Sequence, residues 1–248
     1  MNKIALITGA TSGFGRAIAK KFSENGYAVI VTGRRKERLE SLVRELKGES
    51  HALCFDVRVL SQVETAIHSL PEAWKKIDVL VNNAGLAAGL APVHEGSTDD
   101  WEQMIDTNVK GLLYMTRTVA PLMTANGKGH IINIGSIAGK EVYPNGNVYC
   151  GSKFAVDAIT KGTRIDLVKY GIKVTQIAPG AAETEFSLVR FKGDEEKAAN
   201  VYKGFTPLFA EDIADAAFYV TTLPPHVNIN DLVIMPTAQA SAVVIHRG

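Results

Sequence analysis

The sequence predicts an α/β fold, one doubly wound domain built on a parallel sheet of about seven strands. Three observations support this: short continuous apolar runs recur along the chain, stretches with helical spacing separate most of them, and a glycine-rich turn follows the first run. Continuous apolar runs are typical of strands buried on both faces, and strands that alternate with helices form right-handed crossovers and a parallel sheet. In such folds ligands bind beyond the carboxyl ends of the strands.

The elements follow in order along the chain. Strands are predicted at residues 4–7, 28–31, 53–55, 79–81, 131–134, 174–177 and 232–235. Apolar residues at helical spacing, such as Ile18 and Phe22 after the first strand and Leu39 and Leu42 after the second, predict the helices between strands. No internal repeat or low-complexity segment interrupts this alternation.

Length and composition set further limits. A chain of 248 residues is within the size range of one α/β unit, so a single domain over residues 1–248 is expected. A net charge of +1 argues against nucleic-acid binding, which uses several uncompensated basic residues on one face. No apolar window is long enough to span a membrane, and no signal-peptide pattern precedes the first strand. Cys54 and Cys150 form neither a disulfide framework nor a metal-ligand cluster, so we expect a cytoplasmic protein without a metal site.

The turn after the first strand has the pattern of a phosphate-binding loop. Gly9 permits a tight turn, Gly13 lets the backbone approach a pyrophosphate, and Gly15 allows close packing of helix on strand. An ordinary strand-helix turn is the alternative, but the position between a first strand and a helix is the one that dinucleotide binding requires. The residues expected to bind a dinucleotide here are Gly9, Thr11, Ser12, Gly13, Phe14 and Gly15.

The end of the second strand predicts NADP as the cofactor. An acidic residue at this position binds the ribose hydroxyls of NAD, whereas this chain has Arg34 and Arg35 there. A guanidinium group suits a phosphate dianion, so we expect Arg34 first and Arg35 second to bind the 2′-phosphate. The alternative is two solvated charges at the start of the helix 36–46, a position where the helix dipole disfavours cations.

Polar and small residues also follow the third and fourth strands. They are Asp56 and Val57 after the third and Asn83, Ala84 and Gly85 after the fourth. Ordinary turn chemistry explains such residues equally well in isolation. Their position at strand ends favours contact with the cofactor at the same edge of the sheet.

A tyrosine and a lysine four residues apart predict acid-base chemistry. Tyr149 and Lys153 share one face of a helix, and an ammonium group near a phenol favours the phenolate and lowers its pKa. Tyr149 is then a candidate general acid and base, and Ser136, at the end of the fifth strand, a candidate donor to a substrate carbonyl. A packed ring beside a snorkelling amine is the alternative.

Taken together, these motifs show that the sequence resembles the short-chain dehydrogenases/reductases over essentially its whole length. The resemblance rests on TGATSGFG at 8–15, NNAG at 82–85, DTNVKG at 106–111 and YCGSK at 149–153. It implies a Rossmann-type fold, Tyr149 as acid and base, Ser136 as orienter of the carbonyl, and Lys153 on the nicotinamide ribose. It further implies that Asn108 holds a water in a proton relay, unless this asparagine only bonds to backbone. By the same resemblance, Pro179, Gly180 and Thr184 lie beside the nicotinamide carboxamide.

Within that family the sequence is most similar to the NADP-dependent 3-hydroxy acid dehydrogenases, a similarity carried by residues 101–108, 185–194 and 226–230. A small hydroxy acid as substrate has a carboxylate that needs a partner, and Arg190 is the candidate. Alternatively, Arg190 pairs with Glu183, Glu185 or an acidic group of a neighbouring subunit. The resemblance also implies a homotetramer in which the helices 101–123 and 149–170 pack across interfaces.

Two other functions remain open at this point. One is a reductase of other carbonyls, such as ketones, sugars or 3-oxoacyl thioesters. The other is a sensor that binds NADP without turnover, although a sensor has no use for the Ser136, Tyr149 and Lys153 set.

Overall fold

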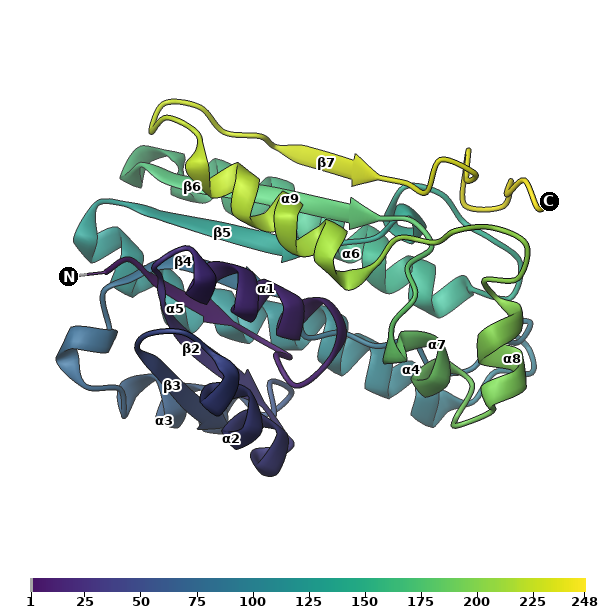
Figure 1. The fold of residues 1–248 in the computed structure, drawn as a ribbon, viewed down its shortest axis with the longest axis horizontal. Helices are drawn as coiled ribbons and strands as arrows, with labels where there is room; N and C mark the ends of the chain where they lie inside the picture. Colours follow the sequence, from purple (N-terminus) through teal and green to yellow (C-terminus); the bar gives the residue numbers. More distant parts are fainter. Residues whose placement is uncertain (1) are drawn as a thin grey trace.

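The structure, a computed structural model, describes residues 2–248 and contains one seven-stranded parallel sheet with the order β3-β2-β1-β4-β5-β6-β7 (Figure 1). The predicted fold class is confirmed. The strands are β1 Ile4–Ile7, β2 Ala28–Gly33, β3 Ser50–Cys54, β4 Ile77–Asn82, β5 Gly129–Ile134, β6 Ile172–Pro179 and β7 Asp231–Ile234.

Helices cover both faces of the sheet (Figure 1). They are α1 Gly13–Glu24, α2 Lys36–Glu45, α3 Leu60–His68, α4 Thr98–Ile105, α5 Leu112–Asn126, α6 Asn147–Leu167, α7 Glu185–Arg190, α8 Glu195–Asn200 and α9 Ala210–Thr222. One apolar core joins the sheet to α1, α2 and α9, and a second joins its other face to α3 and α5. Among the described residues, no helix combines the length and the apolar character needed to cross a bilayer.

The strand order reverses between β1 and β4. The chain runs outward from β1 through β2 to β3, and then returns to the other side of β1 to build β4 to β7. A crevice opens where the two directions part, beyond the carboxyl ends of the strands. In Figure 1, α7 and α8 lie beyond this same end of the sheet.

One irregular segment interrupts the helix predicted at 101–123. Between α4 and α5 the chain forms a π-helical segment, η2, over Asp106–Gly111. Gly111 sits tightly in this segment, because a Cβ there would lie 2.9 Å from a methyl group of Val57. Short π-helical segments often accompany functional sites.

Candidate active site

A cavity of about 520 Å³ lies beyond the carboxyl ends of the strands. Most of the residues predicted for the site line it. They are Gly9, Thr11, Ser12, Gly13, Phe14, Arg34, Arg35, Asp56, Val57, Asn83, Ala84, Gly85, Ser136, Tyr149, Lys153, Pro179, Gly180, Thr184 and Arg190. Gly15 and Asn108 are not among the residues that line it.

The glycine turn has the geometry of a cradle for phosphate. Gly9 and Gly13 have φ values of +65° and +50°, a backbone region that residues other than glycine rarely adopt. A Cβ at Gly15 would lie 2.4 Å from the carbonyl oxygen of Gly9, so α1 can start against the turn only with glycine there. Asn83 ties the turn to the end of β4, because its side-chain amide donates to the carbonyl oxygen of Thr8 at 2.8 Å. The backbone therefore leaves room for a pyrophosphate at the start of α1, and the residues fit a dinucleotide.

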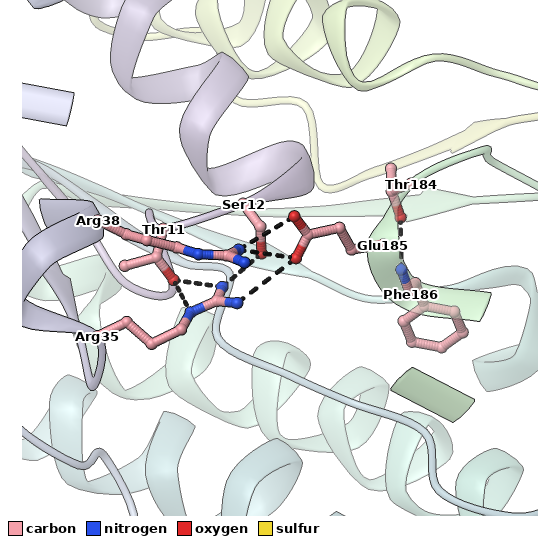
Figure 2. A network of polar contacts seen from close by, with 7 residues as sticks. All are labelled: Thr11, Ser12, Arg35, Arg38, Thr184, Glu185 and Phe186. Carbon is pink, nitrogen blue, oxygen red and sulfur yellow. Dashed lines mark hydrogen bonds and ion pairs between the residues drawn. The ribbon is translucent and has the colours of Figure 1, made fainter. Parts of the chain in front are cut away.

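Two arginines at the start of α2, Arg35 and Arg38, lie at the outer end of this turn (Figure 2). Arg35 donates from Nε and Nη2 to the hydroxyl of Thr11, at 3.1 and 2.6 Å, and from Nη2 to that of Ser12 at 2.9 Å. Arg38, one turn into α2, donates to both carboxylate oxygens of Glu185 at 3.0 Å. Sequence reasoning missed Arg38, although its spacing of four residues from Arg34 was visible.

Arg34 points a different way from Arg35. Its guanidinium lies 3.7 Å from the carboxylate of Asp56, which also pairs with Arg58 at 2.6 Å. Burial alone would raise the pKa of the Asp56 carboxyl, but hydrogen bonds from Arg58 outweigh burial and hold that pKa below its usual value. Arg35 therefore contacts the glycine turn directly, whereas Arg34 pairs with Asp56, and the ranking of the two arginines for a 2′-phosphate stays a prediction.

The structure brings Ser136, Tyr149 and Lys153 to the same wall of the cavity. Tyr149 and Lys153 are both buried, with exposed fractions of 8% and 7%, on the first turns of α6. Lys153 donates from Nζ to the carbonyl oxygen of Ile134 at 3.0 Å, and its Nζ lies 6.0 Å from the centre of the Tyr149 ring. Ser136 follows β5, and its hydroxyl accepts from the backbone N–H of Ala138 at 3.0 Å.

The electrostatics of this pair differ from the expectation that Lys153 lowers the pKa of Tyr149. Burial raises the pKa of the Tyr149 phenol, while the nearby Ser136 hydroxyl and Arg190 guanidinium act in the opposite direction. Burial also lowers the pKa of Lys153, to about 8. With the ammonium directed at a backbone carbonyl and the phenol desolvated, the environment of Tyr149 favours the protonated phenol.

Asn108 lies in η2 and is buried. Its Oδ1 accepts from the backbone N–H of Leu86 at 2.8 Å, and its Nδ2 donates to the carbonyl oxygen of Leu86 at 2.9 Å and to the hydroxyl of Ser152 at 3.0 Å. Because both ends of the amide are engaged by protein groups, this geometry favours the structural alternative for the side chain.

Arg190 lies at the end of α7, above the phenol. Its Nη1 donates to the hydroxyl of Tyr143 at 3.0 Å, and its guanidinium carbon lies 5.6 Å from the centre of the Tyr149 ring. Its Nε and Nη2 are buried without a hydrogen-bond partner, and no carboxylate of residues 2–248 lies within 4.0 Å. The alternatives in which Arg190 pairs with Glu183 or Glu185 are therefore not found within the chain. No motif in the sequence indicated that Tyr143 belongs to the site.

The remaining predicted residues form the segment after β6. Pro179 is the last residue of β6, and Gly180 is confined because a Cβ there would lie 2.5 Å from the side-chain oxygen of Gln239. The hydroxyl of Thr184 accepts from the backbone N–H of Phe186 at 3.2 Å and so caps α7 (Figure 2). This cap places α7 over the cavity.

A dinucleotide-binding fold with a buried phenol and amine in the same cavity as its glycine turn defines an oxidoreductase that works with a nicotinamide dinucleotide. The particular family follows from comparison with known proteins. The model of the short chain dehydrogenase family matches residues 3–194, and the chain belongs to this family.

Several characterised relatives cover nearly the whole chain. An NADP-dependent 3-hydroxy acid dehydrogenase of Salmonella typhi is 52% identical over 98% of this chain and 99% of its own length. Sulfoacetaldehyde reductase 2 of Chromohalobacter salexigens is 48% identical over the full length of both chains. The closed form of a serine dehydrogenase complexed with NADP+ superposes with a TM-score of 0.95, at 49% identity over 99% of this chain and 100% of that one.

Proposed function

We propose that this protein is an NADP-dependent oxidoreductase acting on small 3-hydroxy acids of the serine, allo-threonine and 3-hydroxypropionate type, or on the matching carbonyl compounds. One observation carries the substrate class: two buried nitrogens of the Arg190 guanidinium, Nε and Nη2, have no hydrogen-bond partner within residues 2–248, and they belong to the cavity that Tyr149 also lines. An anion on the substrate would satisfy these donors. The 3-hydroxy acid and serine dehydrogenases among the relatives support the same class.

The cofactor would lie along the carboxyl ends of the strands. Its pyrophosphate would rest on the turn from Gly9 to Gly15, its 2′-phosphate near Arg34 and Arg35, and its nicotinamide beside Pro179, Gly180 and Thr184. The remaining contacts would come from Asp56, Val57, Asn83, Ala84 and Gly85. When bound, the nicotinamide exchanges a hydride with the substrate carbon.

Tyr149 would exchange the proton that accompanies the hydride. In the reductive direction the phenol donates to the carbonyl oxygen, which Ser136 also holds by a hydrogen bond. The raised pKa of Tyr149 suits this donor role, because it keeps the proton on the phenol until charge develops on the substrate oxygen. Lys153 would bind the nicotinamide ribose, and Asn108 would fix the segment behind the phenol.

Two alternatives remain distinguishable. A reductase of neutral ketones, sugars or 3-oxoacyl thioesters would leave the buried donors of Arg190 without a purpose. A non-catalytic NADP sensor would give no role to Tyr149 and Lys153, although both polar side chains are buried in the cavity. We further propose one domain over residues 1–248, a cytoplasmic location and a homotetramer.

The test is a panel of 3-hydroxy acids, amino acids and simple ketones with both cofactors, run on the wild type and on Tyr149→Phe. We expect turnover of the hydroxy acids with NADP, lowered about 100- to 10,000-fold in Tyr149→Phe while NADPH binding is retained. Wild-type turnover restricted to neutral ketones would favour the first alternative. Binding of NADPH without turnover of any compound would favour the sensor.

A further inference from the structure

An ion-pair bridge joins the substrate side of the cavity to its cofactor side. It consists of Glu185, the first residue of α7, together with Arg35 and Arg38 at the start of α2 (Figure 2). Both oxygens of Glu185 lie 3.0 Å from Nη1 of Arg38, and one of them lies 3.5 Å from Nη1 of Arg35. These residues are about 150 positions apart in the sequence and meet only through the fold.

The bridge uses the donors that a 2′-phosphate needs. Arg35 has Nε and Nη2 on the hydroxyls of Thr11 and Ser12 and directs Nη1 at Glu185, so each of its nitrogens already has an acceptor. Hydroxyl groups can rotate and donate to an arriving phosphate, whereas a carboxylate only accepts. Glu185 is therefore the one partner in this network that competes with a phosphate for the same guanidinium groups.

We infer that Glu185 reduces the preference of this site for a 2′-phosphate by holding Arg35 and Arg38 until the phosphate displaces it; this inference rests on the proposed use of NADP. A dinucleotide without that phosphate leaves the bridge intact. A dinucleotide with it has to break the bridge, because two anions on one pair of guanidinium groups repel each other. Glu185 thus lowers the affinity for NADPH and leaves that for NADH nearly unchanged.

The same exchange reaches the substrate side. Glu185 begins the six-residue helix α7 and Arg190 ends it, with its guanidinium over the Tyr149 ring. Release of Glu185 removes the side-chain contact between α2 and α7, which leaves the Thr184 cap to fix the start of the helix whose other end holds the proposed substrate anchor. The 2′-phosphate therefore loosens α7 before substrate binds.

Binding titrations test whether Glu185 lowers the affinity for NADPH. We compare Glu185→Gln with Glu183→Gln, which removes the same charge from an exposed residue that forms no ion pair within residues 2–248. The dissociation constants of NADPH and NADH are measured by fluorescence. The side chains of the bridge are 43% to 49% exposed, so the expected effect is that of one or two exposed ion pairs. Glu185→Gln should bind NADPH roughly three- to tenfold more tightly and NADH within about twofold of the wild type, with Glu183→Gln unchanged.

Hydrogen exchange of the α7 amides tests the coupling, with 2′,5′-ADP as a probe that carries the phosphate but no nicotinamide and 5′-AMP as the control. In the wild type, 2′,5′-ADP should speed exchange in α7 and 5′-AMP should not. Glu185→Gln should exchange fast without either ligand.

Weaker or unchanged NADPH binding by Glu185→Gln, or α7 exchange that 2′,5′-ADP slows or leaves alone in the wild type, would overturn the inference. The same titration also tests the proposed cofactor. If the wild-type protein binds NADH as tightly as NADPH, the proposed use of NADP is wrong.

Discussion

At the scale of single residues, Arg190 is the side chain whose environment most directly indicates a bound ligand. The residue is partly buried, but its Nε and Nη2 are fully buried, and buried nitrogens of a charged group are normally paired because leaving them unpaired is costly. Within residues 2–248 the guanidinium donates only to the neutral hydroxyl of Tyr143, and the rings of Tyr143 and Tyr149 both lie within 6 Å of it. Cation–π contacts hold the group in place but do not satisfy its N–H donors.

We therefore predict that Arg190→Met raises KM for 3-hydroxy acids about 10- to 100-fold, the range expected for a lost charged hydrogen bond. The KM for an uncharged alcohol of the same length should change little. Tyr143→Phe is the matched control, since it removes only the acceptor that orients Arg190 and should have a smaller effect of the same kind. Steady-state kinetics on the paired substrates measure this.

Equal losses on charged and uncharged substrates would assign Arg190 a structural role. That result would also remove the main support for the proposed substrate class while leaving the oxidoreductase assignment intact.

At the scale of elements, apolar periodicity located the strands of the sheet but not all of their bounds. The run 4–7 coincides with β1, whereas the run 53–55 overlaps only the end of β3, which begins at Ser50. β3 is an edge strand whose first residues, Ser50 and His51, are polar and partly exposed, so no continuous apolar run marks its start. Buried central strands were predictable because both of their faces are apolar.

The candidate site was predictable where it depends on one turn or one helix. Tyr149 and Lys153 are neighbours on α6 by spacing alone, and the glycine turn follows β1 directly. The contacts of Glu185 with Arg38 and of Arg190 with Tyr143 join residues 147 and 47 positions apart, which no local pattern shows. The pKa shifts of Tyr149 and Lys153 also depend on burial, which the fold creates.

The outer face of α6 gives the proposed homotetramer a physical basis. Phe154, Ile165 and Val168, the last just beyond the helix, are 42%, 74% and 67% exposed. Their spacings of eleven and three residues place them on one side of the helical segment. Large apolar side chains grouped in this way are typical of a surface that packs against another subunit.

We predict a wild-type mass in solution of about four times the 26.7 kDa of one chain, measured by size-exclusion chromatography with light scattering. Ile165→Asp should shift the population to smaller species, because the interface would then bury a charge. Val93→Asp, at a residue 61% exposed in the loop before α4, should leave the mass unchanged. A monomeric wild type would contradict the homotetramer.

At the scale of the whole molecule, the active site has a cost in stability. Lys153 is buried beside the end of β5, where, among the residues the structure describes, one carbonyl oxygen, that of Ile134, accepts from its ammonium group. Burial disfavours the charged amine and lowers its pKa from the usual 10.5 to about 8. A basic group whose pKa is lower in the folded than in the unfolded state binds its proton less tightly when the protein is folded. At any pH at which the group is protonated in both states, its charge therefore destabilises the fold.

We predict that Lys153→Met makes the protein more stable at pH 7 while abolishing turnover. Below pH 8 both states of the wild type carry the ammonium, and the full destabilisation, about 3 kcal/mol at most for a shift of this size, is present. Between pH 8 and 10.5 the folded state loses its proton first, so the unfolding free energy of the wild type rises with pH relative to the variant.

Denaturant unfolding of both proteins at pH 7, 8, 9 and 10 measures the difference. Lys153→Met also loses the hydrogen bond to the Ile134 carbonyl, which changes the unfolding free energy by an amount that does not depend on pH. The raised pKa of Tyr149 affects stability above pH 10 in both proteins. Neither effect therefore produces a stability difference that changes between pH 8 and 10. A stability difference that stays constant from pH 7 to 10 would mean that Lys153 keeps its ordinary pKa in the fold. The advantage of Lys153→Met should instead shrink steadily above pH 8, which ties the buried amine of the active site directly to the stability of the whole chain.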